Sequence, residues 1–571
     1  FCNVNQLFDA NTEQAGGIEV IKGPATALYG SNAMHGVINV LSAAPTQSPE
    51  HIFSLEAGPD DFYRLRYGYG NTRGRHGVSV RANGSTDGGY KDDSGYDQQK
   101  ITLRHDYDGD SWQVTSALDA TNLNQETAGF IRGYKSYEDE DLKDTNPNPE
   151  AYRDARSMRL YSSASRQLDA DNKLTITPYF RDNEMEFMMH FLPWKPVEEN
   201  GHRSLGLRGT VHTDKGEWHW ANGIDLEYTD GWLEETQDQP WLNPAQPAGV
   251  HYDSQVDATM AAVYSQLRLD LDDRLTVNAG ARLEYNRYDY DNRASDGSAC
   301  APEVKDCRFY RPADREDDFS DWSLNAGISY ALGEQQSAWL RLAQGFRAPQ
   351  ATELYRLQSG QRVAALDSEE LRNLELGLRG EWRGELEYSL AVFYMEKSEV
   401  IFQDADRHNV SGAETRHHGL ELGLNWSFAS DWRLGLDMTL ARHKYDSPIQ
   451  LLGSSGDIEG NDIDTAPRAF GSARLDWDLT SLTGREARAQ LEWVHLGSYY
   501  LEPDNNHKYS GHDLLNLRLE TSLGRNLRAA LRITNLLDED YAERADYGFG
   551  DYRYFVGQPL GAYLELSYHL R

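Results

Sequence analysis

The sequence predicts an all-β protein built as one antiparallel barrel of 22 membrane-spanning strands. Three observations lead to this prediction. After Pro45 the chain runs as segments of about ten residues separated by polar stretches, and 22 such segments can be counted. Within each segment apolar and polar residues alternate, as they do in a strand with one apolar face. The connections between segments alternate between short and long, which is typical of a transmembrane barrel.

The alternation is clearest towards the end of the chain, where Leu515, Leu517 and Leu519 are separated by polar residues. A strand that places one apolar face against lipid and one polar face against water shows this pattern. The predicted strands begin at residues 51, 62, 76, 96, 112, 156, 173, 203, 218, 258, 275, 321, 337, 371, 386, 415, 432, 468, 487, 513, 527 and 560.

The connection lengths decide between a barrel and a soluble β-sandwich, because both alternate along their strands. Every second connection is a few polar residues, as at 71–75, 108–111, 169–172 and 213–217, which predicts tight turns. The intervening connections are mostly long and are expected to be surface loops: 124–154, 185–202, 229–256, 289–318 and 347–370. The first pair, joined at 58–61, is the exception. A sandwich has no reason to alternate in this way, so a barrel is favoured.

Composition excludes several classes of protein. Lys and Arg number 56 against 91 Asp and Glu, a net charge of -35, which excludes a general nucleic-acid surface because phosphate binding needs clustered cations. No run of 18 apolar residues occurs, so a helical membrane span is not expected. The 33 Tyr and 13 Trp suit the aromatic belts of a barrel. No nucleotide-binding loop, zinc-protease motif or nucleophile elbow is present, so no enzyme is predicted.

The chain has three cysteines. Cys300 and Cys307 bracket a short acidic stretch and are predicted to form a disulfide in an oxidising compartment. Cys2 is left over. Its partner could lie upstream, or it could be free or a soft metal ligand.

Residues 17–41, Gly-Ile-Glu-Val-Ile-Lys-Gly-Pro-Ala-Thr-Ala-Leu-Tyr-Gly-Ser-Asn-Ala-Met-His-Gly-Val-Ile-Asn-Val-Leu, resemble the closing segment of the plug domain of TonB-dependent outer-membrane receptors. Residues 345–355, with Leu-Glu-Leu-Gly at 374–377, and residues 535–541, followed by 553–570, resemble barrel motifs of the same family. The resemblance implies that 1–48 are the C-terminal part of a plug and 49–571 the barrel. It also implies that the signal peptide, the TonB box and most of the plug lie upstream.

In this family the plug motif packs the plug and performs no chemistry. The matching residues here are Gly23, Pro24, Tyr29, Gly30, Asn32 and Gly36. The glycines are expected to let the backbone turn sharply in a crowded lumen. The resemblance further implies a charge cluster between Lys22 of the plug and Glu375 and Glu421 of the barrel. Alternation directs both glutamates inward, so we expect a buried cluster in which Lys22 holds the plug.

Candidate ligand contacts lie in two places. Asn3, Asn5 and Gln6 precede the plug motif, where family members present an apex towards the ligand, and Met188, His190 and Trp194 lie in a predicted long loop. The alternatives are a buried plug turn and a packed loop. Soft metal binding by Cys2, Met34, His35, Met189 and His190 is a weaker alternative. The acidic residues 138–141, 317 and 318 are expected to be solvated, or to bind Ca²⁺ as a structural ion.

The function implied by the resemblance is active import across the outer membrane of a bacterium, energised through TonB, ExbB and ExbD. An iron–siderophore complex leads as the ligand, with cobalamin, haem or copper as alternatives. A passive porin or an adhesin-type barrel is the rival class, and the plug motif argues against it. Outer-membrane lipid and lipopolysaccharide are expected partners, and a monomer is expected.

Overall fold

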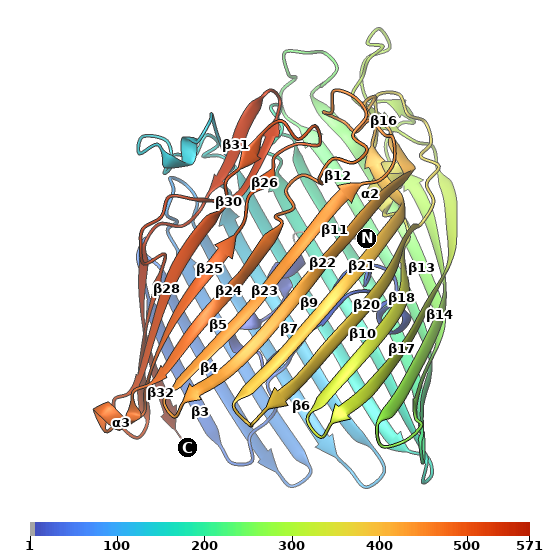
Figure 1. Ribbon diagram of the computed structural model, residues 1–571. Helices are drawn as coiled ribbons and strands as arrows, with labels where there is room; N and C mark the ends of the chain where they lie inside the picture. Colours follow the sequence, from blue (N-terminus) through green and yellow to red (C-terminus); the bar gives the residue numbers. More distant parts are fainter. Residues whose placement is uncertain (1–5, 571) are drawn as a thin grey trace.

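The computed structural model describes residues 6–570, and its strands form one closed barrel (Figure 1). The barrel strands are β3 (Glu50–Ala57), β4 (Tyr63–Arg73), β5 (His76–Asp87), β6 (Tyr96–Asp108), β7 (Gln113–Glu126), β9 (Tyr152–Gln167), β10 (Asn172–Met188), β11 (Val197–Lys215), β12 (Trp218–Gln237), β13 (Gly249–Asp270), β14 (Leu275–Asn292), β17 (Arg315–Gly333), β18 (Gln336–Arg347), β20 (Glu369–Trp382), β21 (Leu386–Gln403), β22 (Asn409–Ala429), β23 (Trp432–Tyr445), β24 (Ala469–Asp478), β25 (Ala487–Leu496), β28 (His512–Ser522), β29 (Leu527–Thr534) and β32 (Gly561–Leu570).

The prediction of 22 antiparallel strands is confirmed for the described residues. The first strand closes the barrel on the last, with His51 opposite Leu570. Outward apolar residues alternate with inward polar ones, as where Leu374 and Leu376 are exposed on the outer surface and Glu375 faces the lumen. Because side chains of a strand point alternately to the two faces, this arrangement gives the barrel an apolar outer band and a charged interior.

Several strands begin earlier than their apolar pattern does. The strands predicted from residues 203, 258 and 415 begin at Val197, Gly249 and Asn409. All three begin at the end of the barrel that carries the long connections, which we call the loop end; the short turns form the turn end (Figure 1). Backbone pairing continues beyond the apolar band, where both faces are polar and alternation carries no signal.

The long connections contain ordered elements that the sequence did not predict. A three-stranded sheet joins β15 (Gly297–Ser298), β16 (Phe309–Arg311) and β19 (Leu357–Gln358), and another joins β8 (Ile131–Arg132), β30 (Ala542–Gly548) and β31 (Asp551–Val556). The remaining elements are η3 (Ser136–Glu138), α2 (Ala351–Tyr355), the pair β26 (Tyr499–Tyr500) and β27 (Lys508–Tyr509), and α3 (Thr480–Thr483) in a turn. Among residues 6–570, no helix is long and apolar enough to cross a membrane.

Residues 6–48, which we call the plug segment, lie inside the barrel (Figure 1). The segment contains η1 (Gln6–Asp9), η2 (Thr12–Gln14), β1 (Gly17–Lys22), α1 (Thr26–Tyr29) and β2 (Gly36–Leu41). β1 and β2 form an antiparallel hairpin of their own that does not join the barrel sheet. α1 packs against β13, β14, β17 and β18, so the plug segment contacts the wall through side chains and loops.

Candidate functional site

Lys22, at the end of β1, forms an ion pair with the barrel. Its Nζ lies 2.9 Å from Glu421 Oε2 on β22. The two side chains are 61% and 28% exposed, so water reaches both charges, whereas the sequence led us to expect burial. An exposed pair contributes at most about 1 kcal/mol, because screening by water weakens it.

Glu375, the other glutamate of the expected cluster, accepts a hydrogen bond of 2.7 Å from Trp339 Nε1. A barrel cation reaches the plug backbone nearby. Arg341 donates to the carbonyl oxygen of Lys22, at 3.2 Å, and to that of Pro24. These are charge-assisted hydrogen bonds to backbone, which are stronger than an exposed ion pair. We therefore place the main polar attachment of β1 at Arg341.

Lys22→Ala is expected to lower the free energy that holds the plug segment by at most about 1 kcal/mol. Arg341→Met removes both hydrogen bonds to the backbone and is expected to cost about 1–3 kcal/mol. The measurement is the urea concentration at which proteinase K begins to cleave the plug segment in the purified receptor. If proteinase K began to cleave both variants at the same urea concentration, the exposed ion pair would hold the plug segment as strongly as Arg341 does.

The turn between β1 and β2 has an unusual backbone. Gly23, Gly30, Asn32 and Gly36 have φ values of +72°, +80°, +75° and +155°. A Cβ on Gly36 would lie 2.5 Å from the carbonyl oxygen of Ile21, so a larger residue there collides with the opposite strand. Tyr29, which ends α1, has its side chain 40% exposed.

A second attachment of the plug was not predicted from the sequence. Arg282 on β14 is buried, with Nη1 2.7 Å from Asp225 Oδ2 and Nε 2.8 Å from Glu284 Oε2. Gly30 rests on this triad: a Cβ there would be 3.0 Å from both Arg282 Nη2 and Glu284 Oε2. The lack of a side chain at Gly30 is what lets α1 approach the triad. The sequence signal was present, because Arg282 and Glu284 alternate with apolar Leu283.

A cavity of about 520 Å³ lies among the loop ends of β10 to β14, and we call it the loop-end pocket. α2 and β30 complete its wall. Its aromatic and sulfur-containing lining residues are Phe187, Met189, Phe191, Trp232, Tyr252, Tyr290 and Tyr355; its charged or ionisable ones include Glu198, His202, Arg356 and Arg544. Phe187 also packs against the cluster around Phe8 of η1, so the plug segment adjoins the pocket. An apolar cavity of this size with a few polar groups is typical of a small-molecule site.

Arg356, which follows α2, is the central charge of the loop-end pocket. Its Nη1 lies 2.9 Å from Glu198 Oε2, and its Nη2 donates to Glu235. Nη2 also lies 3.2 Å from the sulfur of Met189. Burial by itself lowers the pKa of Arg356, but the Glu235 and Glu198 carboxylates outweigh it and hold the pKa above its ordinary value.

The comparisons with known proteins decide the family. A model described as "TonB dependent receptor-like, beta-barrel" matches residues 51–536. The chain belongs to the TonB-dependent receptor family. As such it is an outer-membrane protein, the long connections face outward from the cell, and the porin and adhesin alternatives lose their support.

Individual relatives of the receptor are distant. A vitamin B12 transporter BtuB from Photobacterium profundum is 21% identical over 553 residues, which cover 94% of this chain and 78% of the relative. A pesticin receptor from Yersinia pestis is 22% identical over 562 residues, 92% and 76% of the two chains. The structure of the ferric yersiniabactin uptake receptor FyuA from Yersinia pestis superimposes with a TM-score of 0.78 at 16% identity, covering 97% of this chain and 85% of that one. At this identity the structural likeness shows the fold alone.

The predicted ligand contacts fall in different places. Met188 ends β10, and the next residue, Met189, lines the loop-end pocket. His190 packs against the 127–129 stretch, with Nδ1 3.4 Å from Thr127 Oγ1, and burial lowers its pKa. Trp194 is buried beside the pocket, packed with Tyr252 and Phe309. Asn3 and Asn5 lie outside the described residues, as does Cys2, and Gln6 is described only as the start of η1.

The metal candidates among the described residues lie in two parts of the chain. Among residues 6–570, no group of three or more His, Cys, Asp or Glu side chains is arranged to hold a metal ion. Met34 is buried, and His35 beside it lies near Lys397 and His443, where burial and then Lys397 lower its pKa. Met189 and His190 lie instead in the connection that follows β10. The acidic residues proposed for Ca²⁺ include Glu138 and Glu140, each of which pairs with a lysine, and Asp317, which pairs with Arg315.

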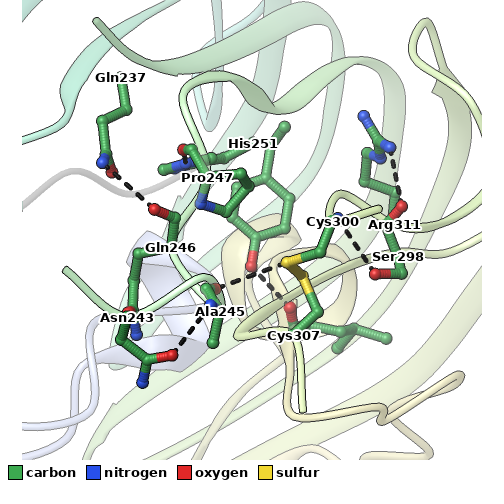
Figure 2. Close-up of a disulfide and its surroundings, with 12 residues drawn as sticks. Gln237, Asn243, Ala245, Gln246, Pro247, His251, Ser298, Cys300, Cys307 and Arg311 are labelled. Carbon is green, nitrogen blue, oxygen red and sulfur yellow. Dashed lines mark hydrogen bonds between the residues drawn. A yellow bond between two sulfur atoms is a disulfide. The ribbon is translucent and has the colours of Figure 1, made fainter. Parts of the chain in front are cut away.

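Cys300 and Cys307 form the disulfide, with Cα atoms 5.7 Å apart. Figure 2 shows the bond beside the 243–247 loop, where Cys300 Sγ lies 3.6 Å from Ala245 O. From the disulfide the chain continues into β16, where the ring of Phe309 stacks on the ring of His251. The two ring centroids are 3.6 Å apart. His251 in turn lies 2.9 Å from Glu235, the carboxylate that binds Arg356. The disulfide-closed loop 300–307 therefore supports, through Phe309 and His251, the Glu235 carboxylate that binds Arg356 of the loop-end pocket.

Replacing both cysteines, Cys300→Ser with Cys307→Ser, is expected to loosen the sheet of β15, β16 and β19. Loss of a native bridge lowers local stability by about 2 kcal/mol, which corresponds to about 30-fold faster amide exchange in residues 309–311 and 357–358. Hydrogen exchange read by mass spectrometry tests this. The pair β26–β27, which belongs to a different sheet, serves as the internal control, and faster exchange there as well would mean a general loss of structure.

Proposed function

We propose that this receptor imports an iron–siderophore complex, which binds in the loop-end pocket before TonB, ExbB and ExbD energise movement of the plug. The observation that carries the proposal is the pocket itself: an aromatic cavity with buried polar groups, located at the loop end and adjoining the plug segment. A chelate held there is within reach of the residues that must move for a path to open. The plug segment corresponds to part of the domain that blocks the lumen in this family.

The pocket also bears on the alternative ligands. A volume of about 520 Å³ suits a drug-sized molecule, whereas cobalamin is much larger. Several solved relatives are named for ferric ligands, among them the receptor for ferric yersiniabactin and the ferric citrate transporter FecA, while another is a copper transporter. An iron chelate is the ligand that the pocket supports best.

Growth on single nutrient sources tests the proposal. A strain lacking the receptor gene, with and without the full-length gene on a plasmid, is supplied in turn with individual ferric siderophores, haemin, limiting cobalamin or limiting copper. We expect the plasmid to restore growth on at least one ferric siderophore, and only when TonB is present. Restoration by cobalamin or copper alone would overturn the ligand, and restoration without TonB would overturn energised import.

A further inference from the structure

The loop-end pocket is lined by aromatic rings from several elements. Phe187, Phe191 and Trp232 come from β10, the loop after it and β12. Two further lining residues, Tyr290 and Tyr355, stack on each other, with ring centroids 4.2 Å apart and planes at 20°. Aromatic rings bind other rings by stacking and edge contacts and bury large apolar areas. A ligand that fills this cavity therefore gains most if it carries aromatic rings.

Carboxylates of the protein itself already neutralise the charge of Arg356. Two carboxylates bracket its guanidinium, Glu198 at 2.9 Å and Glu235 on the other side. Their side chains are 7% and 1% exposed, so neither is well solvated. If Arg356 turned towards an anionic ligand, it would leave two buried carboxylates without their cation, which is costly. The carboxylates would also repel the anion directly.

The other lining arginine, Arg544, has a carboxylate partner that it shares with a second arginine. Arg544 Nη2 lies 3.1 Å from Asp546 Oδ2, within β30. The same aspartate also binds Arg553. The remaining ionisable residue of this group, His202, is buried in β11. Arg356 is thus neutralised by two buried carboxylates, whereas Arg544 shares one aspartate with Arg553 and is 63% exposed, so solvent screens the attraction that it offers a polyanion.

We infer that the loop-end pocket selects a metal chelate that carries aromatic rings and little or no net charge, and that Glu198 and Glu235 reject polyanionic chelates. The inference rests on the proposed function and narrows its ligand. Glu198 and Glu235 act as specificity determinants: by occupying Arg356 they remove the attraction that a strongly anionic ferric chelate would otherwise find, and the aromatic walls supply affinity that does not depend on charge.

Three iron(III) probes separate ring content from charge. The tris(benzohydroxamate) complex is neutral and aromatic, the tris(acetohydroxamate) complex is neutral and aliphatic, and the tris(catecholate) complex is aromatic and trianionic. Binding of radiolabelled iron to the purified full-length receptor is measured for each, in excess free chelator, with metal-free chelator as competitor. We expect the neutral aromatic complex to bind at least about tenfold more tightly than either of the others.

Glu198→Gln tests the role of the carboxylate, with Glu199→Gln as the matched control. Glu199 is the next residue of β11 and is exposed on the other face. Glu198→Gln is expected to tighten binding of the trianionic complex by about tenfold and to leave the neutral complex within about threefold. Glu199→Gln is expected to change neither. The wild-type ranking of the probes tests the ligand class even if Glu198→Gln fails to fold.

The outcomes distinguish the two proposals. If the trianionic complex binds the wild-type receptor as tightly as the neutral aromatic one, the charge inference is wrong and ferric uptake still stands. Equal binding of the aliphatic and aromatic neutral complexes overturns the role of the rings. If no ferric probe binds and no ferric siderophore supports growth, the proposed function itself fails.

Discussion

Arg282→Met is expected to destabilise the receptor by about 3–5 kcal/mol, because it removes the buried cation that pairs with two buried carboxylates. Arg282, Asp225 and Glu284 have side chains that are 1%, 6% and 2% exposed. The methionine leaves two buried carboxylates facing each other without the positive charge between them. The change also removes the surface on which Gly30 rests, so the plug segment is expected to loosen together with the wall.

Heat-induced unfolding of the purified receptor in detergent measures the loss, and protease cleavage of the plug segment in urea reports its release. Arg287→Met is the matched control, because Arg287 lies on the same strand and pairs with Glu316, but both side chains are largely exposed. Only a small change is expected there, because solvent screens the pair. A similar shift of the unfolding midpoint in both variants would contradict the assignment of a buried, compensated triad.

Gly36→Ala is expected to break the plug hairpin at its end nearest Lys22. Gly36 has φ +155° and pairs with Lys22 in the hairpin register, and an added Cβ would lie 2.5 Å from a backbone oxygen of β1. A side chain in this region of backbone space costs about 1–3 kcal/mol, and the collision adds to it. The end of β1 must move, which displaces the carbonyl groups that Arg341 binds.

The urea concentration at which proteinase K cleaves the plug segment is expected to fall in Gly36→Ala. Gly17→Ala, at the other end of the same hairpin, provides the control: its Cβ would make an ordinary contact of 3.7 Å with a leucine side chain. The barrel should melt unchanged in both variants, because β1 and β2 do not join its sheet. Unaltered protease resistance in Gly36→Ala would show that the turn has room to adapt.

The barrel could be predicted because its signals are local. Each strand shows its two faces within about ten residues, and each connection shows its length directly. Leu515, Leu517 and Leu519 suffice to identify one strand and its lipid face. The plug motif at 17–41 likewise lies in one stretch of chain. The early starts of β11 and β13 were missed because pairing continues there without an apolar face.

The site was predicted only in part, because its residues are far apart in the sequence. Met188 and Trp194 flank Met189 in the connection that lines the loop-end pocket, but the pocket also includes Arg356 and Arg544, which no local pattern singles out. The expected burial of Lys22 was wrong, since exposure depends on how much of the lumen the neighbouring elements fill.

The sequence by itself determined a closed barrel of 22 strands, a plug motif, a disulfide loop and membership of an import family. Only the tertiary structure decided that Arg282 is buried against Gly30 and that two glutamates occupy Arg356. The physical reason is the range of the interactions. Alternation and turn length arise between residues close in the chain, whereas the compensation of a charge depends on which distant residues the folded barrel brings within a few ångströms of it.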